Sequence, residues 1–473
     1  MRNLPAALFL SLPIAVAGCA QYGPYRTSTT LCEGSSNACA TSVLYRHKPP
    51  GQAMFDYSLG FVEFNDQGDP WPAPAAQQQR AVVLDYLERQ AARHDLLMVV
   101  FVHGWHHSAK GQDSGPLSLP GDPLDGNVKT FQTVLQGLAR GERSQALAQR
   151  RAPREVAGIY VGWRGESITL KLLNNLTFWD RKNTAAQVGH GGVTELLSRL
   201  ELIKRTQDSK ARDAAAKPAV PDTMAIPATG CDRLVASGQR ISSQTKLIVV
   251  GHSFGGLVVQ SAVGQILEDR AVRTKGGDYG CQLDVEGFGN LVVLINPAFE
   301  AQRYSVIHNL AAARRFYPPE QLPVELILTS EADDATRYLF PLGRHVSTVF
   351  DRNGWDRQNV TAVGHYAPYI THTLTRQPSP PQVTLQQAWL DESRPDREVC
   401  VAGLTLTRTQ LSERNPYLNV RVAGNLIEGH NDIGEPQIIE FVKQMILLSS
   451  LPDKARKTAS AVTDPRCPQA SRS

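Results

Sequence analysis

The chain has 473 residues, of which 42% are hydrophobic and 20% are charged, so it can bury a sizeable core in one large domain with insertions or in two ordinary domains. Its 49 lysines and arginines nearly balance 45 acidic residues, and the formal net charge is +4. The basic residues are scattered among acidic ones, which argues against a nucleic-acid partner.

The amino-terminal segment has the pattern of a targeting signal. Arg2 precedes an apolar run from Leu4 to Ala17, and this run is too short to cross about 30 Å of hydrocarbon. We interpret residues 1–18 as a signal peptide. The small residues before Cys19 resemble the lipobox of bacterial lipoproteins, which implies a lipidated Cys19 and membrane anchoring at the cell envelope, and Ala20 favours the outer membrane. The alternative is an unmodified Cys19 and free secretion.

Cysteine usage fits an oxidising compartment. Six of the seven cysteines remain when Cys19 is set aside, and an even count is typical of disulfide pairing. Cys32 and Cys39 bracket a turn of Gly, Ser and Asn, so they are the expected pair, while the sequence does not select pairings for the rest. No CxxC or Cys/His cluster indicates a metal site.

Residues 19–54 are polar and lack sustained periodicity, which predicts a flexible tether before a body over residues 55–451; residues 452–473 are expected to be a disordered tail. Within the body, short apolar runs are separated by helix-like stretches. Because they are apolar throughout, the runs predict strands covered on both faces, in a mostly parallel sheet flanked by helices: an α/β fold. The runs are 61–64, 96–102, 156–161, 246–250, 291–295 and 324–328.

Two insertions interrupt this pattern. The first, about 164–243, has an apolar and aromatic first part, a helical stretch around 193–203 and a polar part. It is consistent with a lid over a site or with a surface decoration. The second, about 376–419, contains a hairpin-like segment at 399–407.

A nucleophile motif follows one of the predicted strands. The run 246–250 leads into Gly251-His-Ser253-Phe-Gly255-Gly256 and then into an apolar helical stretch, so a GxSxG motif lies between a strand and a helix. The flanking glycines avoid clashes at a sharp turn that holds the hydroxyl clear of the backbone. We predict that Ser253 is a nucleophile.

Such a serine needs hydrogen-bond donors for the negative charge of a tetrahedral intermediate. The backbone amide of Phe254, the residue after the serine, is one expected donor. The predicted strand 96–102 ends in His103-Gly104-Trp105, which resembles oxyanion loops of the HG type and implies the Trp105 backbone amide as the second donor. The histidines of this loop have no carboxylate or cysteine close in sequence, which favours a hydrogen-bonded loop over a metal site.

The acid is expected after a later strand. The run 324–328 leads to an acidic turn, and a carboxylate at the carboxyl end of a strand can orient an imidazole and stabilise its charge. Asp333 is preferred because of its Ser-x-x-Asp spacing. Asp334 and Glu331 remain alternatives, as does a solvated acidic turn.

The base is expected before the last helix. His430 precedes the segment 436–446, whose periodicity is that of an amphipathic closing helix. It is the preferred general base, which takes the serine proton and returns one to the leaving group. His365 and His372 are the rivals, but both lie before the second insertion. Trp163 and Arg164 also follow a strand on the side of the site, and Arg164 either meets an anionic substrate or forms a structural ion pair.

Together, the motif around Ser253, the His103-Gly-Trp105 loop, Asp333 and Gly429-His430 resemble the α/β-hydrolase superfamily, in an esterase-like bacterial branch, over about residues 57–448. The resemblance implies the α/β-hydrolase fold, a catalytic Ser/Asp/His triad and no cofactor. The implied function is a serine hydrolase that acts on a small-molecule or lipid ester through an acyl-serine intermediate at the cell envelope. The alternative is a noncatalytic envelope protein that keeps the fold to bind a partner or lipid.

Overall fold

The computed structural model describes residues 23–49, 55–114, 121–165, 178–215, 242–274, 284–314, 317, 321–347, 356–377, 383–390, 397–409 and 414–451. The expected signal peptide, the lipidation site at Cys19 and the expected tail at 452–473 lie outside these residues.

The described chain forms one 12-stranded sheet in the order β1-β2-β3-β5-β4-β6-β7-β8-β12-β9-β11-β10. From β3 across to β9 all neighbours are parallel, whereas the pairs β2–β3, β9–β11 and β11–β10 are antiparallel. The mostly parallel sheet predicted from the sequence is therefore confirmed. The strands are β1 (Cys32–Gly34), β2 (Leu44–His47), β3 (Tyr57–Phe64), β4 (Leu96–Val102), β5 (Glu155–Trp163), β6 (Lys246–His252), β7 (Leu291–Ile295), β8 (Glu325–Ser330), β9 (His372–Thr375), β10 (Glu398–Val401), β11 (Leu404–Arg408) and β12 (Tyr417–Val422).

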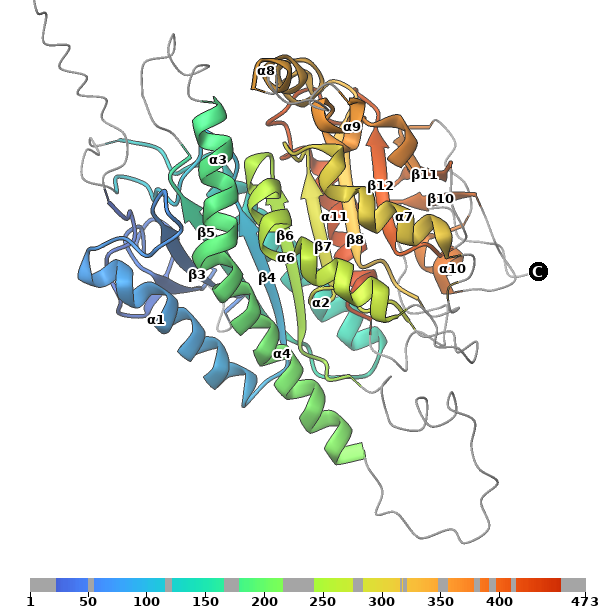
Figure 1. Cartoon of the computed structure of the whole chain (residues 1–473). Coiled ribbons are helices and arrows are strands. Elements are labelled where there is room, and N and C mark those ends of the chain that lie inside the picture. The colour runs from blue at the N-terminus through green and yellow to red at the C-terminus, as the bar shows by residue number, and fades with distance from the viewer. Residues whose placement is uncertain are drawn as a thin grey trace, which may run out of the picture.

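Helices cover both faces of the sheet. In Figure 1, α1, α4, α6 and α7 lie in front of the strands, and α2 and α11 lie behind them. None of the described helices is long and apolar enough to cross a bilayer. The helices are α1 (Pro74–Ala91), α2 (Gly126–Ala148), α3 (Phe178–Val188), α4 (Thr194–Ala215), α6 (Phe254–Arg273), α7 (Ser305–Ala313), α8 (Phe340–Ser347), α9 (Arg357–Val360), α10 (Leu385–Leu390) and α11 (Pro436–Ser449), with the short turns η2 (Gly189–Val193), η3 (Ala301–Tyr304), η4 (Ala335–Leu339), η5 (Val363–His365) and η6 (Ala367–Tyr369).

The two helical layers explain why the central strands are apolar throughout. In β4, alternate residues point to opposite faces, so Met98 and Val100 enter the core under α1 and α6, whereas Val99 and Phe101 enter the core under α2 and α11. Every residue of β4 is buried. A solvated face would have produced alternation of polar and apolar residues instead.

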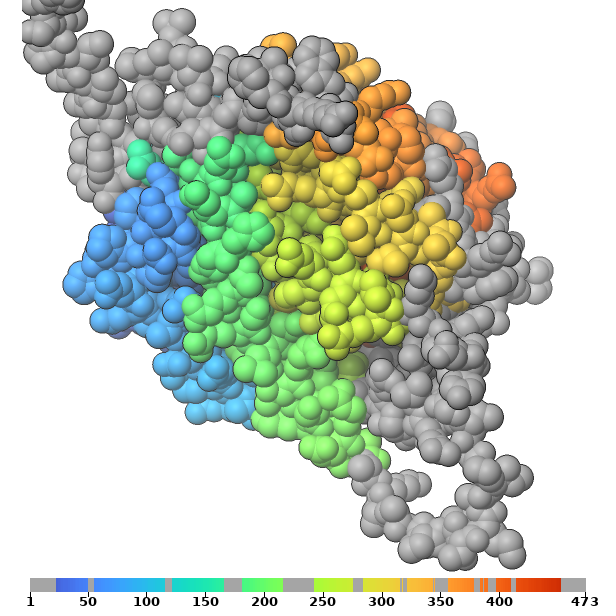
Figure 2. All heavy atoms as spheres, viewed as in Figure 1, coloured from blue at the N-terminus to red at the C-terminus, as the bar shows by residue number. Residues whose placement is uncertain are grey.

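Residues 178–215 of the first insertion form a packed layer of the fold, so the interpretation as a surface decoration is wrong for that part. Here α3, η2 and α4 pack against α6, and in the space-filling view α4 fills the surface between α1 and α6 (Figure 2). Leu196, Leu197 and Leu200 are fully buried. The segment is a layer of the fold because its leucines recur on one helical face, and the helix expected around 193–203 is present as α4. The rest of the insertion, 166–177 and 216–241, lies outside the described residues.

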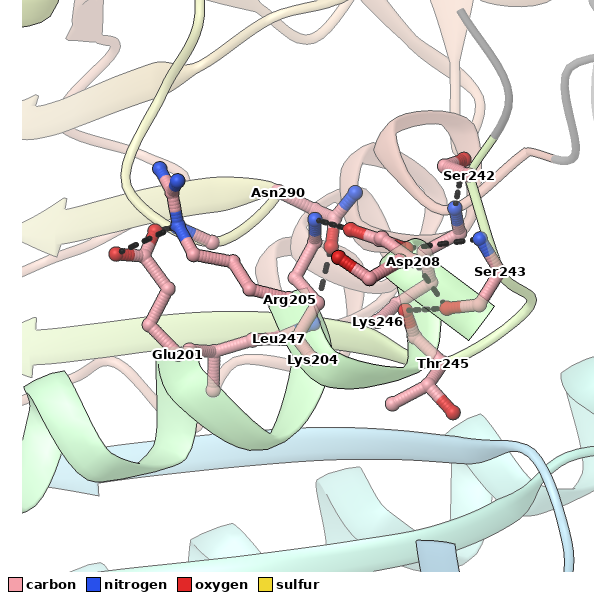
Figure 3. A network of polar contacts seen from close by, with 12 residues as sticks. Glu201, Lys204, Arg205, Asp208, Ser242, Ser243, Thr245, Lys246, Leu247 and Asn290 are labelled. Atoms are coloured by element: carbon pink, nitrogen blue, oxygen red, sulfur yellow. Dashed lines mark hydrogen bonds and ion pairs between the residues drawn. The ribbon is translucent and has the colours of Figure 1, made fainter. Parts of the chain in front are cut away.

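A polar network ties the end of α4 to the start of β6 (Figure 3). The Asp208 carboxylate accepts hydrogen bonds from Lys204 Nζ at 2.6 Å and from the backbone amide and hydroxyl of Ser243, both at 2.8 Å. The neighbouring Leu247 amide donates to Asn290 Oδ1 at 3.0 Å. Because these bonds fix where β6 begins, they also fix the level in the sheet at which it ends.

The predicted tether is wrong for residues 23–49. Here β1 and β2 extend the sheet beside β3, and Arg26 is buried at 1% exposure. The Arg26 guanidinium donates to the carbonyls of Ala109 and Ala40 at 2.8 and 2.6 Å, while its backbone amide donates to Glu63 at 2.9 Å. Burial of a charge is tolerated only with such partners. The segment is polar, and its strands are only 3 and 4 residues long. The sequence therefore shows no periodicity from which these strands could be predicted.

Two smaller expectations are confirmed. Cys32 and Cys39 form a disulfide, which closes the turn after β1. The hairpin expected at 399–407 is formed by β10 and β11, with Val399 opposite Leu406. This hairpin pairs with β9, so the second insertion extends the sheet rather than standing apart from it.

Glu325 is a buried acid at the opposite end of the strands from their carboxyl edge. It is the first residue of β8 and has no solvent exposure, and neither carboxylate oxygen has a hydrogen-bond partner among the residues that the structure describes. Burial, and then the charge of Glu268, raise the pKa of Glu325 to about 8. The folded protein therefore keeps a proton that the unfolded chain loses near its ordinary pKa of 4.5.

We expect Glu325→Gln to change how stability depends on pH. A raised folded pKa means that the wild type loses stability as pH rises from about 4.5 to about 8, by up to about 4 kcal/mol, and the glutamine variant lacks this loss. Urea unfolding at pH 5 and pH 8 measures the free energy of unfolding of both proteins. Glu398→Gln, at an exposed position of β10, is the control and should follow the wild type. Parallel pH profiles for wild type and Glu325→Gln would contradict the assignment.

Candidate active site

The turn after β6 holds Ser253 in a strained backbone conformation. Its φ is +55° and its ψ is −122°, a region that side-chain-bearing residues rarely adopt and that persists only when the surroundings enforce it. The Ser253 amide donates to the Ile295 carbonyl at 3.0 Å, and its own carbonyl accepts from the amides of Gly256 and Ala298 at 2.9 and 3.2 Å. Hydrogen bonds to the end of β7 and the residues after it on one side, and to α6 on the other, therefore hold the strained conformation in place.

The glycines of the motif allow β6, α6 and β4 to meet. A Cβ at position 251 would lie 2.6 Å from the Gly255 carbonyl oxygen, and a Cβ at position 255 would lie 2.1 Å from the Val102 carbonyl oxygen. Both contacts are with backbone, which cannot rotate away. The Gly-x-Ser-x-Gly spacing thus reflects backbone packing, and the packing places the serine side chain at the carboxyl edge of the sheet.

Three residues that are distant in sequence meet at this edge. Ser253 Oγ lies 2.6 Å from His430 Nε2, and His430 Nδ1 lies 2.9 Å from each oxygen of the Asp333 carboxylate. Ser253 follows β6, Asp333 follows β8 and His430 follows β12. The structure therefore brings the three predicted catalytic residues together in the predicted order.

The carboxylate sets the tautomer of the imidazole. Burial alone would raise the pKa of Asp333, but the hydrogen bond and charge interaction with His430 and two hydrogen bonds from Thr336 lower it. The Thr336 hydroxyl donates to Asp333 at 2.5 Å and its amide at 3.1 Å. An ionised Asp333 accepts only, so His430 Nδ1 carries the proton and Nε2 is left to accept from Ser253.

The alternatives at the acid and base positions lie elsewhere. Asp333 is fully buried, whereas Glu331 and Asp334 are exposed. His365 does not reach the serine; its Nε2 lies 2.9 Å from the Thr336 hydroxyl, so it supports Asp333 from behind. His372 is buried in β9 beside the Thr371 hydroxyl at 2.8 Å. Neither rival histidine bonds directly to Ser253 or to Asp333.

The backbone of His430 is fixed by two side chains that the sequence analysis did not identify. Its carbonyl accepts hydrogen bonds from His252 Nε2 and Asn296 Nδ2, both at 3.0 Å. Asn296 Oδ1 in turn accepts from the Ser330 amide at 3.0 Å, and the Ser330 hydroxyl donates to the Ile427 carbonyl at 2.5 Å. The position of Asn296 at the carboxyl end of β7 was the available signal.

The predicted oxyanion loop passes directly beside the nucleophile. A Cβ at Gly104 would lie 2.8 Å from the Cβ of Ser253, so only glycine allows this approach. The Gly104 carbonyl accepts from His103 Nδ1 at 2.8 Å. Because a trans peptide points its carbonyl and amide in opposite directions, this bond also fixes the direction of the Trp105 amide. The Phe254 amide, the other predicted donor, is the first of α6, where amides have no acceptor within the helix.

His103 has a structural role in this loop. Its Nε2 accepts from the Trp163 amide at 3.0 Å, and the Trp163 indole donates to the His103 carbonyl at 2.8 Å. Burial lowers the pKa of His103 to about 4. The hydrogen-bonded role expected for this loop is therefore observed at His103. Within the described residues, no group of three or more His, Cys, Asp or Glu side chains is placed to hold a metal ion.

Arg164 forms the structural ion pair that was one of its two interpretations. Its guanidinium lies 3.4 Å from the Asp66 carboxylate, which also accepts from Arg181 at 2.9 Å.

No family model, no curated protein and no solved structure matches this chain.

We expect the His252 contact to control the reactivity of Ser253. His252→Leu removes the donor to the His430 carbonyl, and a small displacement of His430 should slow fluorophosphonate labelling of Ser253 by about tenfold or more. His252→Gln carries an amide donor of similar reach and should recover most of the rate. Labelling rates across pH, with thermal unfolding as a check on folding, measure the effect. Equal rates in wild type and His252→Leu would show that the contact does not position the base.

Proposed function

We propose that this protein is a serine hydrolase of the α/β-hydrolase fold that cleaves carboxylic esters through an acyl-Ser253 intermediate. The observation that carries the proposal is the unbroken hydrogen-bonded chain from Ser253 Oγ through His430 to Asp333. It starts at a strained strand-to-helix turn that presents the hydroxyl at the end of β6.

The fold assignment rests on the arrangement around this chain. The nucleophile, the acid and the histidine follow three parallel strands in that order along the sequence, as in α/β hydrolases. Helices cover both faces of the sheet, and the site lies at the carboxyl edge, where ligands bind in open α/β sheets.

The proposed reaction has two acyl-transfer steps. His430 Nε2 takes the Ser253 proton as Oγ attacks the ester carbonyl carbon. The Trp105 and Phe254 amides stabilise the oxyanion of the tetrahedral intermediate. The intermediate collapses when His430 returns the proton to the alcohol oxygen, and a water molecule then attacks the acyl-serine in the same manner. Asp333 remains ionised and stabilises the imidazolium.

Esters are the proposed substrates because an alkoxide is a better leaving group than the amide anion that an unprotonated amide would have to expel. The triad itself does not set the leaving group. A small-molecule or lipid ester can form the same acyl-serine, and no cofactor takes part in this mechanism.

The decisive test is Ser253→Ala. We expect the full-length protein to be labelled by a fluorophosphonate probe and to hydrolyse p-nitrophenyl esters, and both activities to vanish in the variant because the attacking oxygen is absent. Hydrolysis of esters of increasing acyl length measures the substrate range. A folded protein that is neither labelled nor active would favour a noncatalytic binding protein.

The acid can be tested with its own neighbour as control. Asp333→Asn should lower kcat by about three to four orders of magnitude, because an amide at this position favours the wrong imidazole tautomer. Asp334→Asn changes the exposed adjacent residue and should leave kcat within about twofold of wild type. Steady-state hydrolysis measures both variants, and equal losses would contradict the assignment of Asp333.

We also propose that the enzyme is anchored at the cell envelope through a lipidated Cys19. The support is the resemblance of the residues before Cys19 to a lipobox. Labelled palmitate should enter the wild type and not Cys19→Ala, which should be released from the membrane fraction. Equal incorporation in both proteins would contradict the anchor.

A further inference from the structure

The helical segment that follows Asp333 exposes three large apolar side chains. Tyr338, Leu339 and Leu342 are 57%, 56% and 65% exposed. They lie where η4 runs into α8, and helix positions three and four apart share one side. The same segment turns Thr336 inward, where it is buried and donates to Asp333 at 2.5 Å. The three exposed residues, here called the η4–α8 patch, thus form the outer surface of the segment that supports the acid.

Clustering distinguishes the patch from the other exposed apolar side chains. Single exposed apolar residues are normal, whereas grouped ones mark surfaces that contact a protein or a membrane. A tyrosine in such a group is typical of a membrane interface, where its ring lies at the level of the lipid headgroups. The remaining large apolar residues that are exposed in the described part of the chain each stand alone in sequence: Leu31, Leu147, Leu202, Val272 and Val306.

The patch lies at the carboxyl edge of the sheet, which also carries the triad. β8 ends at Ser330, and the Arg337 guanidinium donates to the Glu331 carbonyl at 3.0 Å, so the segment stays close to the end of the strand. In Figure 1, α8 lies at the top of the view, at the end of the sheet to which the arrow of β12 points. A surface that covers the patch therefore meets the edge at which Ser253 lies.

The chain that leads to Cys19 departs from the same edge. The amides of Tyr25 and Arg26 each donate to the Glu63 carboxylate at 2.9 Å, and Glu63 is the last but one residue of β3. Because β3 runs parallel to β6 and β8, its carboxyl end lies at the edge of the triad. Tyr25 is six residues after Cys19, and six residues span at most about 21 Å. A lipid on Cys19 would therefore hold this edge close to the membrane.

The strand order places the nucleophile between the anchor and the patch. β3 lies on one side of β6 and β8 on the other, and the five strand spacings from β3 to β8 amount to about 24 Å. A membrane that meets both ends of this span passes over the end of β6. We propose that the η4–α8 patch docks on the lipid surface to which Cys19 is anchored, so that the edge carrying Ser253 faces the membrane. This orientation rests on the proposed lipidation of Cys19.

The charges beside the patch indicate how it binds lipid. Glu331 and Asp334 are exposed, and so is Arg337, whose guanidinium carbon lies 5.2 Å from the centroid of the Tyr338 ring. Charges of both signs give no net attraction to anionic headgroups, so the contact is apolar. Binding to vesicles should therefore change little as salt rises from about 0.05 to about 0.5 M, whereas a contact made by exposed charges would weaken.

Vesicle binding without the anchor tests the patch by itself. Full-length Cys19→Ala protein is mixed with vesicles of phosphatidylethanolamine and phosphatidylglycerol, and flotation measures the bound fraction. We expect binding, and we expect added Leu339→Ser and Leu342→Ser changes to lower the partition coefficient by about tenfold or more, because two apolar side chains no longer enter the interface. The matched control adds Leu147→Ser and Leu202→Ser, at exposed leucines of α2 and α4, and should bind as Cys19→Ala does.

Two outcomes of the flotation experiment would overturn the proposal. One is the absence of binding by Cys19→Ala protein, and the other is an equal loss in the patch variant and in the matched control. Thermal unfolding of each variant checks that it is folded.

Photocrosslinking identifies what covers the patch in the protein with an intact Cys19. The full-length chain carries p-benzoylphenylalanine at position 342 and is placed in the same vesicles with an alkyne-labelled phospholipid. We expect a crosslink to lipid from position 342 but not from position 147, because α2 ends at the opposite edge of the sheet, before β5 begins. Equal lipid labelling from both positions, or a crosslink from position 342 to a second copy of the chain, would overturn the proposal.

These readouts separate the docking surface from the proposed function. Neither requires ester hydrolysis, and palmitate incorporation reports on Cys19 independently. Vesicle binding that depends on the patch but occurs without palmitate incorporation supports the docking surface and rejects the anchor. Palmitate incorporation with neither vesicle binding by Cys19→Ala nor a lipid crosslink from position 342 rejects the docking surface and leaves the anchor standing.

Discussion

The strained backbone at Ser253 is the constraint on which the rest of the structure depends. A φ of +55° at a residue with a side chain carries a cost of about 1–3 kcal/mol that the surroundings must offset. The surroundings of β6 can offset this cost because β6 lies inside the sheet, between β4 and β7, and is buried along its whole length. The helical layers on both faces, including the α3–α4 segment of the first insertion, provide that burial. The insertion therefore helps to hold the turn at Ser253 in its strained conformation.

The other two members of the triad depend on backbone anchoring. His430 is 177 residues from Ser253 and 97 from Asp333 in sequence, so loop closure alone would leave it loosely placed. Its carbonyl is held by His252 and Asn296, which adjoin the ends of the neighbouring strands β6 and β7. The side chain reaches the serine from a backbone that the sheet itself locates. Geometry of this kind requires supporting residues as much as the reacting ones.

The features that could be predicted from the sequence are those that a local residue pattern indicates. Runs such as 96–102 showed buried strands, and the glycines around Ser253 showed a tight turn. Arg26 was not predicted to be buried because its partners, Glu63 and the Ala109 carbonyl, are distant in sequence. Spacing favoured Asp333 but left Asp334 as an alternative, because the property that separates the two residues is burial. His252 and Asn296 were not identified because their common partner is a carbonyl on a remote loop.

The electrostatics of the site follow from how its other histidines are buried. Burial lowers the pKa of His103 to about 4, of His252 to about 3 and of His365 to about 4, so all three are uncharged at neutral pH. His252 and His365 lie one hydrogen bond away from His430 and from the hydroxyl that supports Asp333. A charged imidazolium at either position would repel the positive charge that His430 acquires when it takes the serine proton. Because these neighbours are neutral donors and acceptors, they position His430 and Asp333 without opposing that charge, and the Asp333 carboxylate stabilises it at close range.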